Sequence, residues 1–151
     1  MAELADRAKE RGLRVTLEFM PISSIVDLAA GWNIVSKANR DNAGLCFDTW
    51  HYFRSMPNPD LLAKIPGDKI FEVQLADALQ ALQGENLTDD LLRFRKLPGE
   101  GELDIAGVTA ILKSIGAWNS VGPEVFADAM DKLSADQVGT QCRAATDKFL
   151  V

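Results

Sequence analysis

Four polar side chains stand at matching places in this sequence, each toward the end of a short apolar run. They are Glu18 in LRVTLEFM, Asp48 in GLCFD, Gln74 in KIFEVQLAD and Glu124 in VGPEVF. Gathering three carboxylates in one sheltered place is unfavourable, because like charges repel and each group loses its hydration. Either some of them are protonated or a cation lies among them. A divalent metal ion would offset the repulsion and would also supply Lewis-acid chemistry.

The elements that must position these groups alternate between strand-like and helix-like patterns. Short apolar runs predict strands over residues 13–20, 44–48, 69–77 and 121–126. One helical pattern precedes the first strand and one follows each of the four strands, over residues 2–11, 24–38, 60–64, 105–115 and 135–149. Strands that alternate with helices through short connections predict a parallel sheet with right-handed crossovers.

Local signals refine these boundaries. Residues suited to cap helices stand before three of the predicted helices: Ser23 or Ser24, then Asp104, then Ser134. A loop is expected between the second strand and its helix, and an irregular stretch is expected from the end of the third strand to residue 103.

Side-chain direction separates two faces of the predicted sheet. Because successive residues of a strand point to opposite sides, the apolar positions share one face that should pack on helices: Leu13, Val15, Leu17, Phe19, Leu45, Phe47, Phe71, Val73, Leu75, Val121, Pro123 and Val125. The four polar groups fall on the other face, near the carboxyl end of each strand. Glu72 lies one layer deeper on that face, and Arg14 has matching parity, so an internal ion pair is expected between them.

Composition and charge exclude several classes of function. The 151 residues include 47% hydrophobic and 25% charged residues, which is typical of one globular domain over residues 1–151. A net charge of −6 without a Lys/Arg cluster disfavours nucleic-acid binding. No run approaches the ~20 apolar residues that span a membrane, and the charged N-terminus does not resemble a secretory signal. Cys46 and Cys142 form no metal or redox motif, so free thiols in the cytoplasm are the simplest interpretation.

Five segments together resemble the xylose-isomerase-like TIM-barrel superfamily. They are LEF with Glu18, CFDTWH with Asp48 and His51, VQLAD with Gln74 and Asp77, RKLPGEGELD with Arg95, and GPEVF with Glu124. The resemblance implies an α/β TIM barrel of which this chain is the C-terminal half, with four βα units and parallel strands. A full barrel has ~250 residues, so the missing half is expected from dimerisation, from a complementary half-barrel, or from a longer protein of which this chain is a truncated part.

The resemblance also implies a metal centre. Glu18, Asp48, Gln74 and Glu124 would be the ligands, and an oxygen-only set favours Mg²⁺ or Mn²⁺. The alternative is a solvated, hydrogen-bonded ring of polar groups at the barrel mouth. Gln74 departs from the epimerases of the superfamily, in which His is usual, and it agrees better with the 3-dehydroshikimate dehydratases.

Three further residues are expected to bind substrate. His51 is the only histidine and follows Asp48 by three positions, as in the family's DxxH motif; a loop histidine bonded to a carbonyl or water is the alternative. Arg95 in an RxxPG loop would hold a substrate oxygen, although Arg93 competes and a solvated surface charge is the alternative. Trp50 is predicted on the loop after a metal strand, where it would touch substrate.

Three functions remain open from the sequence. The first is a divalent-metal-dependent sugar or sugar phosphate isomerase or epimerase, in which the catalytic residues Glu18 and Glu124 move a proton through an enediolate. The second is a metal-dependent dehydratase of the 3-dehydroshikimate or inosose type. The third is a non-catalytic half-barrel fragment. A single histidine disfavours the zinc-cluster chemistry of endonuclease IV, another member of the superfamily.

Overall fold

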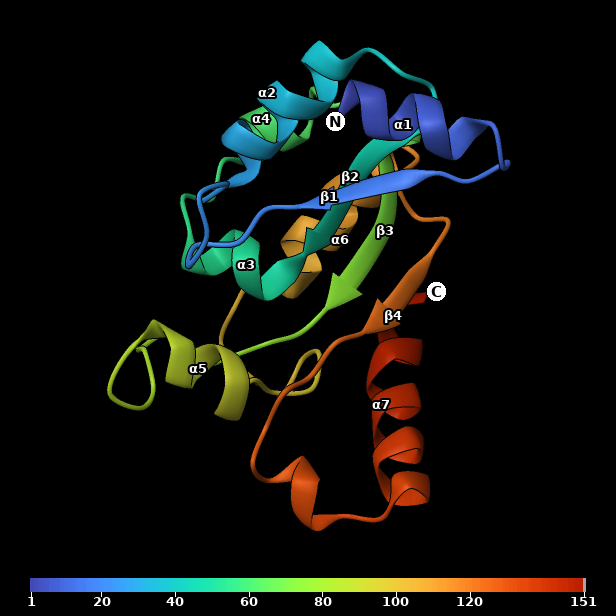
Figure 1. Ribbon diagram of the computed structural model, residues 1–151. Helices are drawn as coiled ribbons and strands as arrows, with labels where there is room; N and C mark the ends of the chain where they lie inside the picture. The colour runs from blue at the N-terminus through green and yellow to red at the C-terminus, as the bar shows by residue number, and fades with distance from the viewer. Residues whose placement is uncertain (151) are drawn as a thin grey trace.

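The computed structural model describes residues 1–150 as a four-stranded sheet with helices (Figure 1). The strands are β1 (Val15–Glu18), β2 (Ala43–Asp48), β3 (Ile70–Leu75) and β4 (Val121–Pro123). The helices are α1 (Ala2–Lys9), α2 (Leu28–Ala38), α3 (Thr49–Arg54), α4 (Pro59–Leu62), α5 (Leu87–Arg93), α6 (Ile105–Ser114) and α7 (Ala135–Leu150), with 3-10 turns η1 (Gly67–Lys69) and η2 (Met130–Lys132).

The sheet has the topology of consecutive βα units. Its strand order is β1-β2-β3-β4, and every neighbouring pair is parallel. The strands twist strongly from β1 to β4 (Figure 1), as expected for part of a barrel wall. The predicted half-barrel architecture is therefore confirmed.

Apolar residues of one sheet face form the core against the helices. Phe19 and Phe47 are both fully buried, and their rings meet edge to face with centroids 5.8 Å apart. Leu45 packs so closely on α2 that a Cβ at Gly31 would lie 3.3 Å from it. Leu75 is also fully buried in the same core. The predicted alternation is confirmed for these positions.

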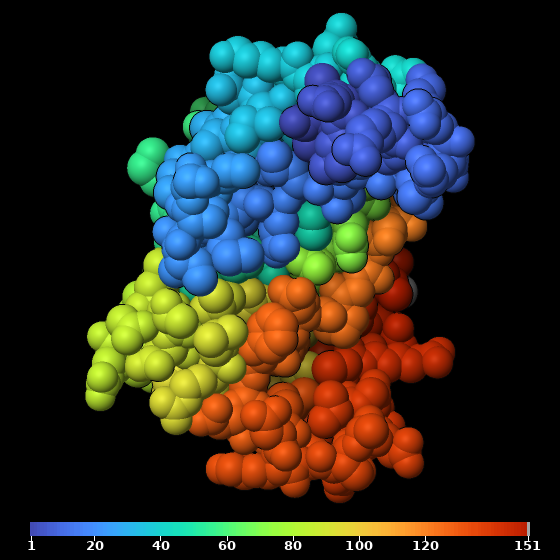
Figure 2. Space-filling view, in the orientation of Figure 1, coloured from blue at the N-terminus to red at the C-terminus, as the bar shows by residue number. Residues whose placement is uncertain are grey.

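The opposite face of the sheet is the less covered one. Figure 2 views the molecule with this face toward the reader, and the teal and green atoms of the β2 and β3 region stay visible between the blue segment around β1 and the orange segment around β4. In a complete barrel, this face would look inward, toward the barrel axis.

A β-bulge corrects one predicted position. The register shifts where Leu45 pairs with Ile70 but Cys46 pairs with Glu72, so Phe71 is an extra residue. Its ring consequently lies against Gly44, where an added Cβ would come within 2.7 Å of it, and not on the helix-facing side. The expected Arg14–Glu72 ion pair is also wrong, because the Arg14 guanidinium stacks on Phe71 at 4.6 Å and no Glu72 ion pair occurs within residues 1–150.

Helix caps explain where several boundaries differ from prediction. Asp27, and neither of the serines before it, caps α2 by accepting a hydrogen bond from the Ala30 N–H at 2.8 Å. Asp48 caps α3, so a helix starts directly after β2 where a loop was expected. The stretch expected to be irregular contains α5, which Asn86 caps.

Two of the predicted caps are confirmed. Asp104 accepts a hydrogen bond from the Gly107 N–H at 2.9 Å at the start of α6. Before α7, Ser134 and Gln137 bond each other's backbone N–H groups reciprocally, which is a capping box.

Candidate metal and substrate site

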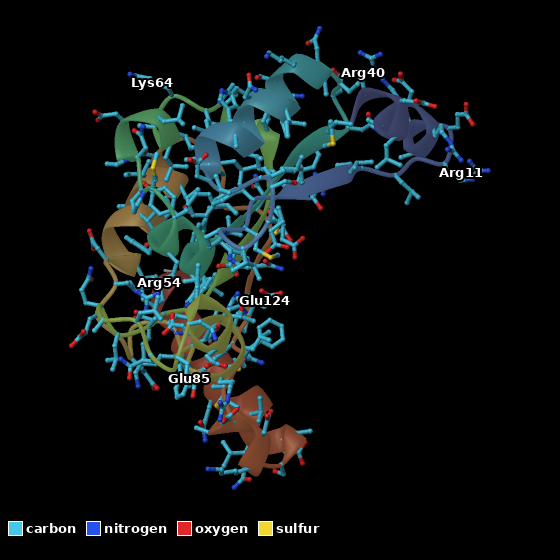
Figure 3. All side chains as sticks on the ribbon, turned by 60° about the vertical axis from the view of Figure 1, so that its left-hand side comes forward. Arg11, Arg40, Arg54, Lys64, Glu85 and Glu124 are labelled. Carbon is cyan, nitrogen blue, oxygen red and sulfur yellow. The ribbon has the colours of Figure 1, made fainter. Side chains whose placement is uncertain are left out.

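The carboxyl ends of the four strands bring the predicted polar groups to one edge of the sheet. Asp48 pairs in register with Gln74, and the Glu124 N–H donates to the Leu75 carbonyl at 3.0 Å. In Figure 3, Glu124 lies at the end of the sheet opposite Arg11 and Arg40, which precede β1 and β2. The predicted convergence of strand ends is therefore present in the structure.

Asp48 is the fully buried centre of the site. One carboxylate oxygen accepts the His51 backbone N–H at 2.8 Å and thereby starts α3. The other oxygen accepts Nη1 of Arg95, also at 2.8 Å. One side chain therefore caps a helix and pairs with a cation at the same time, which fixes its orientation.

Arg95 reaches this centre from a short extended segment held on both sides. Its backbone N–H donates to the Phe126 carbonyl at 3.1 Å. Its Nη1 also meets the carbonyl and the carboxylate of Glu124, at 3.0 and 3.2 Å. The guanidinium stacks near the rings of Trp50 and Phe126, at 5.1 and 5.3 Å. Its Nη2 is buried and has no hydrogen-bond partner within residues 1–150.

His51 and Glu18 close the other side of the site. The His51 Nε2 lies 3.3 Å from a Glu18 carboxylate oxygen. Glu18, Asp48 and His51 each offer a donor atom, and these three atoms all lie within 4.8 Å of one another. The histidine side chain is almost fully buried, and its Nδ1 has no hydrogen-bond partner in the described part of the chain.

Gln74 lies between Asp48 and Glu124. Its side-chain N–H₂ donates to a Glu124 carboxylate oxygen at 3.3 Å. Its Oε1 is buried and accepts no hydrogen bond from the described residues. A buried carbonyl oxygen without a donor is unfavourable by itself, and a cation would satisfy it. This oxygen and the carboxylates of the site fit a divalent ion, and the nitrogen of His51 extends the possible metals to Zn²⁺.

Charge in the site is not balanced by the protein alone. Three carboxylates (Glu18, Asp48 and Glu124) face one guanidinium, that of Arg95, which leaves two negative charges when all three are ionised. Burial and the charge of Asp48 raise the pKa of Glu124, and Arg95 opposes that rise. Burial and the surrounding carboxylates also raise the pKa of the Cys46 thiol, which lies on the same face of β2.

Trp50 differs from its predicted place. It belongs to α3 and is fully buried, and its indole N–H donates to Asp90 at 3.1 Å. Arg54 pairs with the same carboxylate at 2.8 Å. The ring therefore packs near the Arg95 guanidinium and has no exposed surface that a ligand could contact. Sequence reasoning missed this buried Asp90–Arg54 pair because no motif marks two residues so far apart.

Comparisons with known proteins agree with this architecture. The family model described as xylose isomerase-like TIM barrel matches residues 1–144. The chain belongs to this family. No helix within residues 1–150 is both long enough and apolar enough to cross a membrane.

Several curated proteins resemble the chain in sequence. A 3-dehydroshikimate dehydratase from Pseudomonas aeruginosa is 35% identical over 129 residues, which cover 85% of this chain and 20% of that protein. An inosose isomerase from Bacillus licheniformis is 32% identical over 139 residues, which cover 91% of this chain and 49% of that protein. This xylose isomerase-like chain therefore spans half or less of the length of these curated relatives.

In two solved structures, the matched part is likewise about half of the whole chain. A crystal structure of an IolI protein with a bound zinc atom superimposes with a TM-score of 0.89 at 29% identity, covering 99% of this chain and 53% of that one. An L-ribulose 3-epimerase superimposes with a TM-score of 0.71 at 20% identity and shares the fold. The four βα units thus correspond to about half of a xylose isomerase-like barrel.

Proposed function

We propose that this chain carries the metal and proton-transfer site of a divalent-metal-dependent isomerase or epimerase that acts on a hydroxylated ketone of the sugar or cyclic polyol type. The observation that supports this most is the position of Glu18 at the end of β1 and of Glu124 directly after β4, the two outer strands of the sheet. Asp48 and Gln74 lie between them, and the cluster has two negative charges in excess when its three carboxylates are ionised. This arrangement has a place for a cation and a base on each side of it.

Glu18, Asp48, Gln74 and Glu124 would hold the metal, with His51 beside Glu18. Mg²⁺ and Mn²⁺ suit the oxygens, while the His51 nitrogen and the zinc of the related IolI structure make Zn²⁺ a competitor. When bound, the metal would supply Lewis acidity that polarises a substrate carbonyl.

Glu18 and Glu124 would move the proton. A carboxylate next to the α-carbon removes a proton, and the second carboxylate returns it from the opposite side. Burial and the charge of Asp48 raise the pKa of Glu124, which makes this carboxylate a stronger base and better matched to work near neutral pH. The buried His51 and Arg95 side chains would orient the substrate oxygens, because each keeps one nitrogen without a partner within residues 1–150.

A dehydratase is the second candidate, and two observations favour it. One of the most similar relatives is a 3-dehydroshikimate dehydratase, and Gln74 stands where the resemblance expects His in epimerases. The early step would be the same proton removal, followed by loss of a β-hydroxyl group. The Nη2 of Arg95, which has no hydrogen-bond partner among the described residues, suits the carboxylate of such a substrate.

The rest of the pocket would come from outside these four βα units. The less covered face of the sheet (Figure 2) and the unpaired outer edges of β1 and β4 suit a second copy of the chain, a complementary half-barrel or further segments of a longer protein. The small-molecule substrate would then lie between this site and that added wall.

Two readouts test the proposal on the same protein. The full chain is loaded with Mn²⁺, Mg²⁺ or Zn²⁺ and given an inosose in D₂O; deuterium at the α-carbon without a change in ultraviolet absorbance supports an isomerase or epimerase. Growth of ultraviolet absorbance with 3-dehydroshikimate supports the dehydratase. If neither signal is seen with any of the metals, with or without an added N-terminal half, the proposal is wrong and the chain is a non-catalytic half-barrel fragment.

A further inference from the structure

Asp77 is a buried carboxylate that the proposed chemistry does not use. It follows β3 and is only 1% exposed. One of its oxygens accepts the backbone N–H groups of Ala78 and Leu103, at 2.8 and 3.1 Å. The other oxygen accepts those of Gly99 and Gly101, both at 3.0 Å. Four backbone donors surround this carboxylate, and no ion pair to it occurs within residues 1–150.

The loop around Asp77 is built for this contact. A Cβ at Gly101 would collide with the Asp77 carboxylate and with the Ala78 carbonyl oxygen, so the loop approaches as closely as it does only with glycine. Gly99 has a φ of +80°, which favours glycine for a second reason. The PGEG segment therefore wraps a carboxylate from this same chain.

The backbone of Asp77 holds the residue next to Arg95. The Asp77 N–H donates to the Lys96 carbonyl at 2.9 Å, and the Lys96 N–H donates back at 2.8 Å. On the other side, the Arg95 N–H donates to the Phe126 carbonyl. The segment that carries Arg95 is thus clamped between the end of β3 and the chain after β4. The loop that follows it is tied to the Asp77 side chain.

We infer that Asp77 is a positioning residue: by gathering the 99–103 loop and bridging to Lys96, it places the Arg95 guanidinium on Asp48 and Glu124. In its catalytic consequence this inference rests on the proposed function, although the placement of Arg95 can be tested without it. Asparagine has nearly the same shape but only one acceptor oxygen. In Asp77→Asn, an N–H₂ group would face two backbone N–H donors, and the loop would have to move.

The first readout is the Nε–H signal of Arg95 in nitrogen-15 NMR of the full chain. This N–H donates to the Leu91 carbonyl at 3.2 Å inside the protein, so its exchange with water should be slow, and Arg95→Lys identifies the signal by removing it. Asp77→Asn should speed its exchange at least about tenfold. Asp27→Asn is the matched control, because Asp27 also binds a backbone N–H but caps the distant α2, and it should leave the exchange unchanged.

The second readout is a double-mutant cycle on kcat/KM. Asp77→Asn should lower kcat/KM by about 10²-fold, as misplacement of an orienting group does. In the Arg95→Lys background, the same change should cost less than about threefold, because both substitutions remove one function. If the two losses multiply, or if Arg95 Nε–H exchange in Asp77→Asn equals that of the wild type, Asp77 has only a structural role and the inference fails.

A second variant covers the case in which Asp77→Asn does not fold. Gly101→Ala pushes a methyl group against the Asp77 carboxylate and should produce the same faster exchange. Gly139→Ala on α7, where nothing lies within 4 Å of the added Cβ, is its control. If the wild-type chain shows no activity even with an added N-terminal half, the proposed function is wrong, yet the exchange measurement would still decide the role of Asp77.

Discussion

Two buried carboxylate–guanidinium pairs, Asp90–Arg54 and Asp48–Arg95, each place a guanidinium near the Trp50 ring, at 5.9 and 5.1 Å, and they differ in how completely their hydrogen-bonding groups are satisfied. In the Asp90–Arg54 pair, Asp90 accepts bonds from Trp50, Arg54 and the Gln83 backbone. The two other nitrogens of the Arg54 guanidinium, Nη2 and Nη1, donate to the Leu79 and Gln80 carbonyls, at 2.7 and 3.1 Å. Every nitrogen of that guanidinium has an acceptor.

In the Asp48–Arg95 pair, by contrast, not every nitrogen of the guanidinium has a hydrogen-bond acceptor among the described residues. Its guanidinium leaves Nη2 without a partner within residues 1–150, and the neighbouring His51 and Gln74 each leave one buried atom without a partner there. Two further carboxylates lie in the same cluster. The fully hydrogen-bonded Asp90–Arg54 pair holds the backbone of residues 79–83 in place. The Asp48–Arg95 cluster still has buried polar atoms that could bind a ligand. Hydrogen-bond satisfaction alone therefore marks the Asp90–Arg54 pair as structural and the Asp48–Arg95 cluster as the candidate site.

The largest expected effect is on catalysis. Glu124→Gln removes a proposed base and should lower kcat by about 10²–10⁴-fold, or roughly 3–5 kcal/mol in the activation barrier. Metal-free Glu124→Gln should unfold at no lower urea concentration than the wild type, because a repelling charge is lost from the cluster. Urea titration and initial rates check both expectations. Retained activity would show that Glu124 moves no proton.

Breaking the Asp90–Arg54 pair should destabilise the fold, whereas Glu124→Gln should not. Asp90→Asn leaves the Arg54 guanidinium buried with a weakened partner, and it should lower the free energy of unfolding by about 3 kcal/mol. Urea denaturation of the full chain measures this loss. Because Trp50 also loses its charged acceptor, its fluorescence should change as well. A loss below that of an exposed ion pair would mean that the Asp90–Arg54 pair contributes no more than a surface contact.

Metal bound at the Asp48–Arg95 cluster should stabilise the folded chain, and the gain should depend on the ligands of this cluster. At a Mn²⁺ concentration 100 times its Kd, the free energy of unfolding should rise by about 2.7 kcal/mol, and a chelator should reverse the gain. Glu18→Gln should lose most of this gain, whereas Asp128→Asn, on the surface, should keep it. In crystals soaked with Mn²⁺, an anomalous peak within ~2.0–2.3 Å of Glu18, Asp48 and Glu124 oxygens is expected. A peak elsewhere would contradict the proposed ligand set.

The half-barrel architecture was predicted from the family resemblance, whereas sequence pattern was sufficient for the parallel sheet and for the convergence of the strand ends. Strand alternation and the fixed direction of parallel strands determine these features, and both are properties of short segments. The roles proposed for the converging side chains stay predictions. Phe71 was misplaced because a bulge reverses parity locally, and nothing in KIFEVQLAD distinguishes the extra residue.

Other features depend on contacts between distant segments, which local pattern does not contain. Trp50 was predicted to touch substrate because its strand ends at the site, but Asp48 starts a helix at once and turns the indole into the core. Asp77 is part of a segment that carries the family resemblance, yet three of the four backbone donors to its carboxylate lie 22 to 26 residues further along the chain. Such contacts become visible only once the fold brings the segments together.

The smallest effect concerns a third carboxylate–guanidinium pair, exposed on the surface. Arg93 and Asp128 lie 2.9 Å apart with about half of each side chain exposed, and the hydrogen bond from Arg93 holds the pKa of Asp128 below its usual value. Because the folded-state pKa is lowered, the contribution of this pair to the free energy of unfolding is present above the unfolded-state pKa of ~3.9. It is lost as the pH falls through the folded-state value.

Asp128→Asn should therefore flatten the acid side of the stability–pH curve slightly. At neutral pH it should lower the free energy of unfolding only by the small contribution of a surface ion pair. Urea midpoints measured from pH 2 to 7 check this. A loss as large as that of Asp90→Asn would show that burial does not set the difference between the pairs, because the exposed pair would then stabilise the chain as much as the buried one.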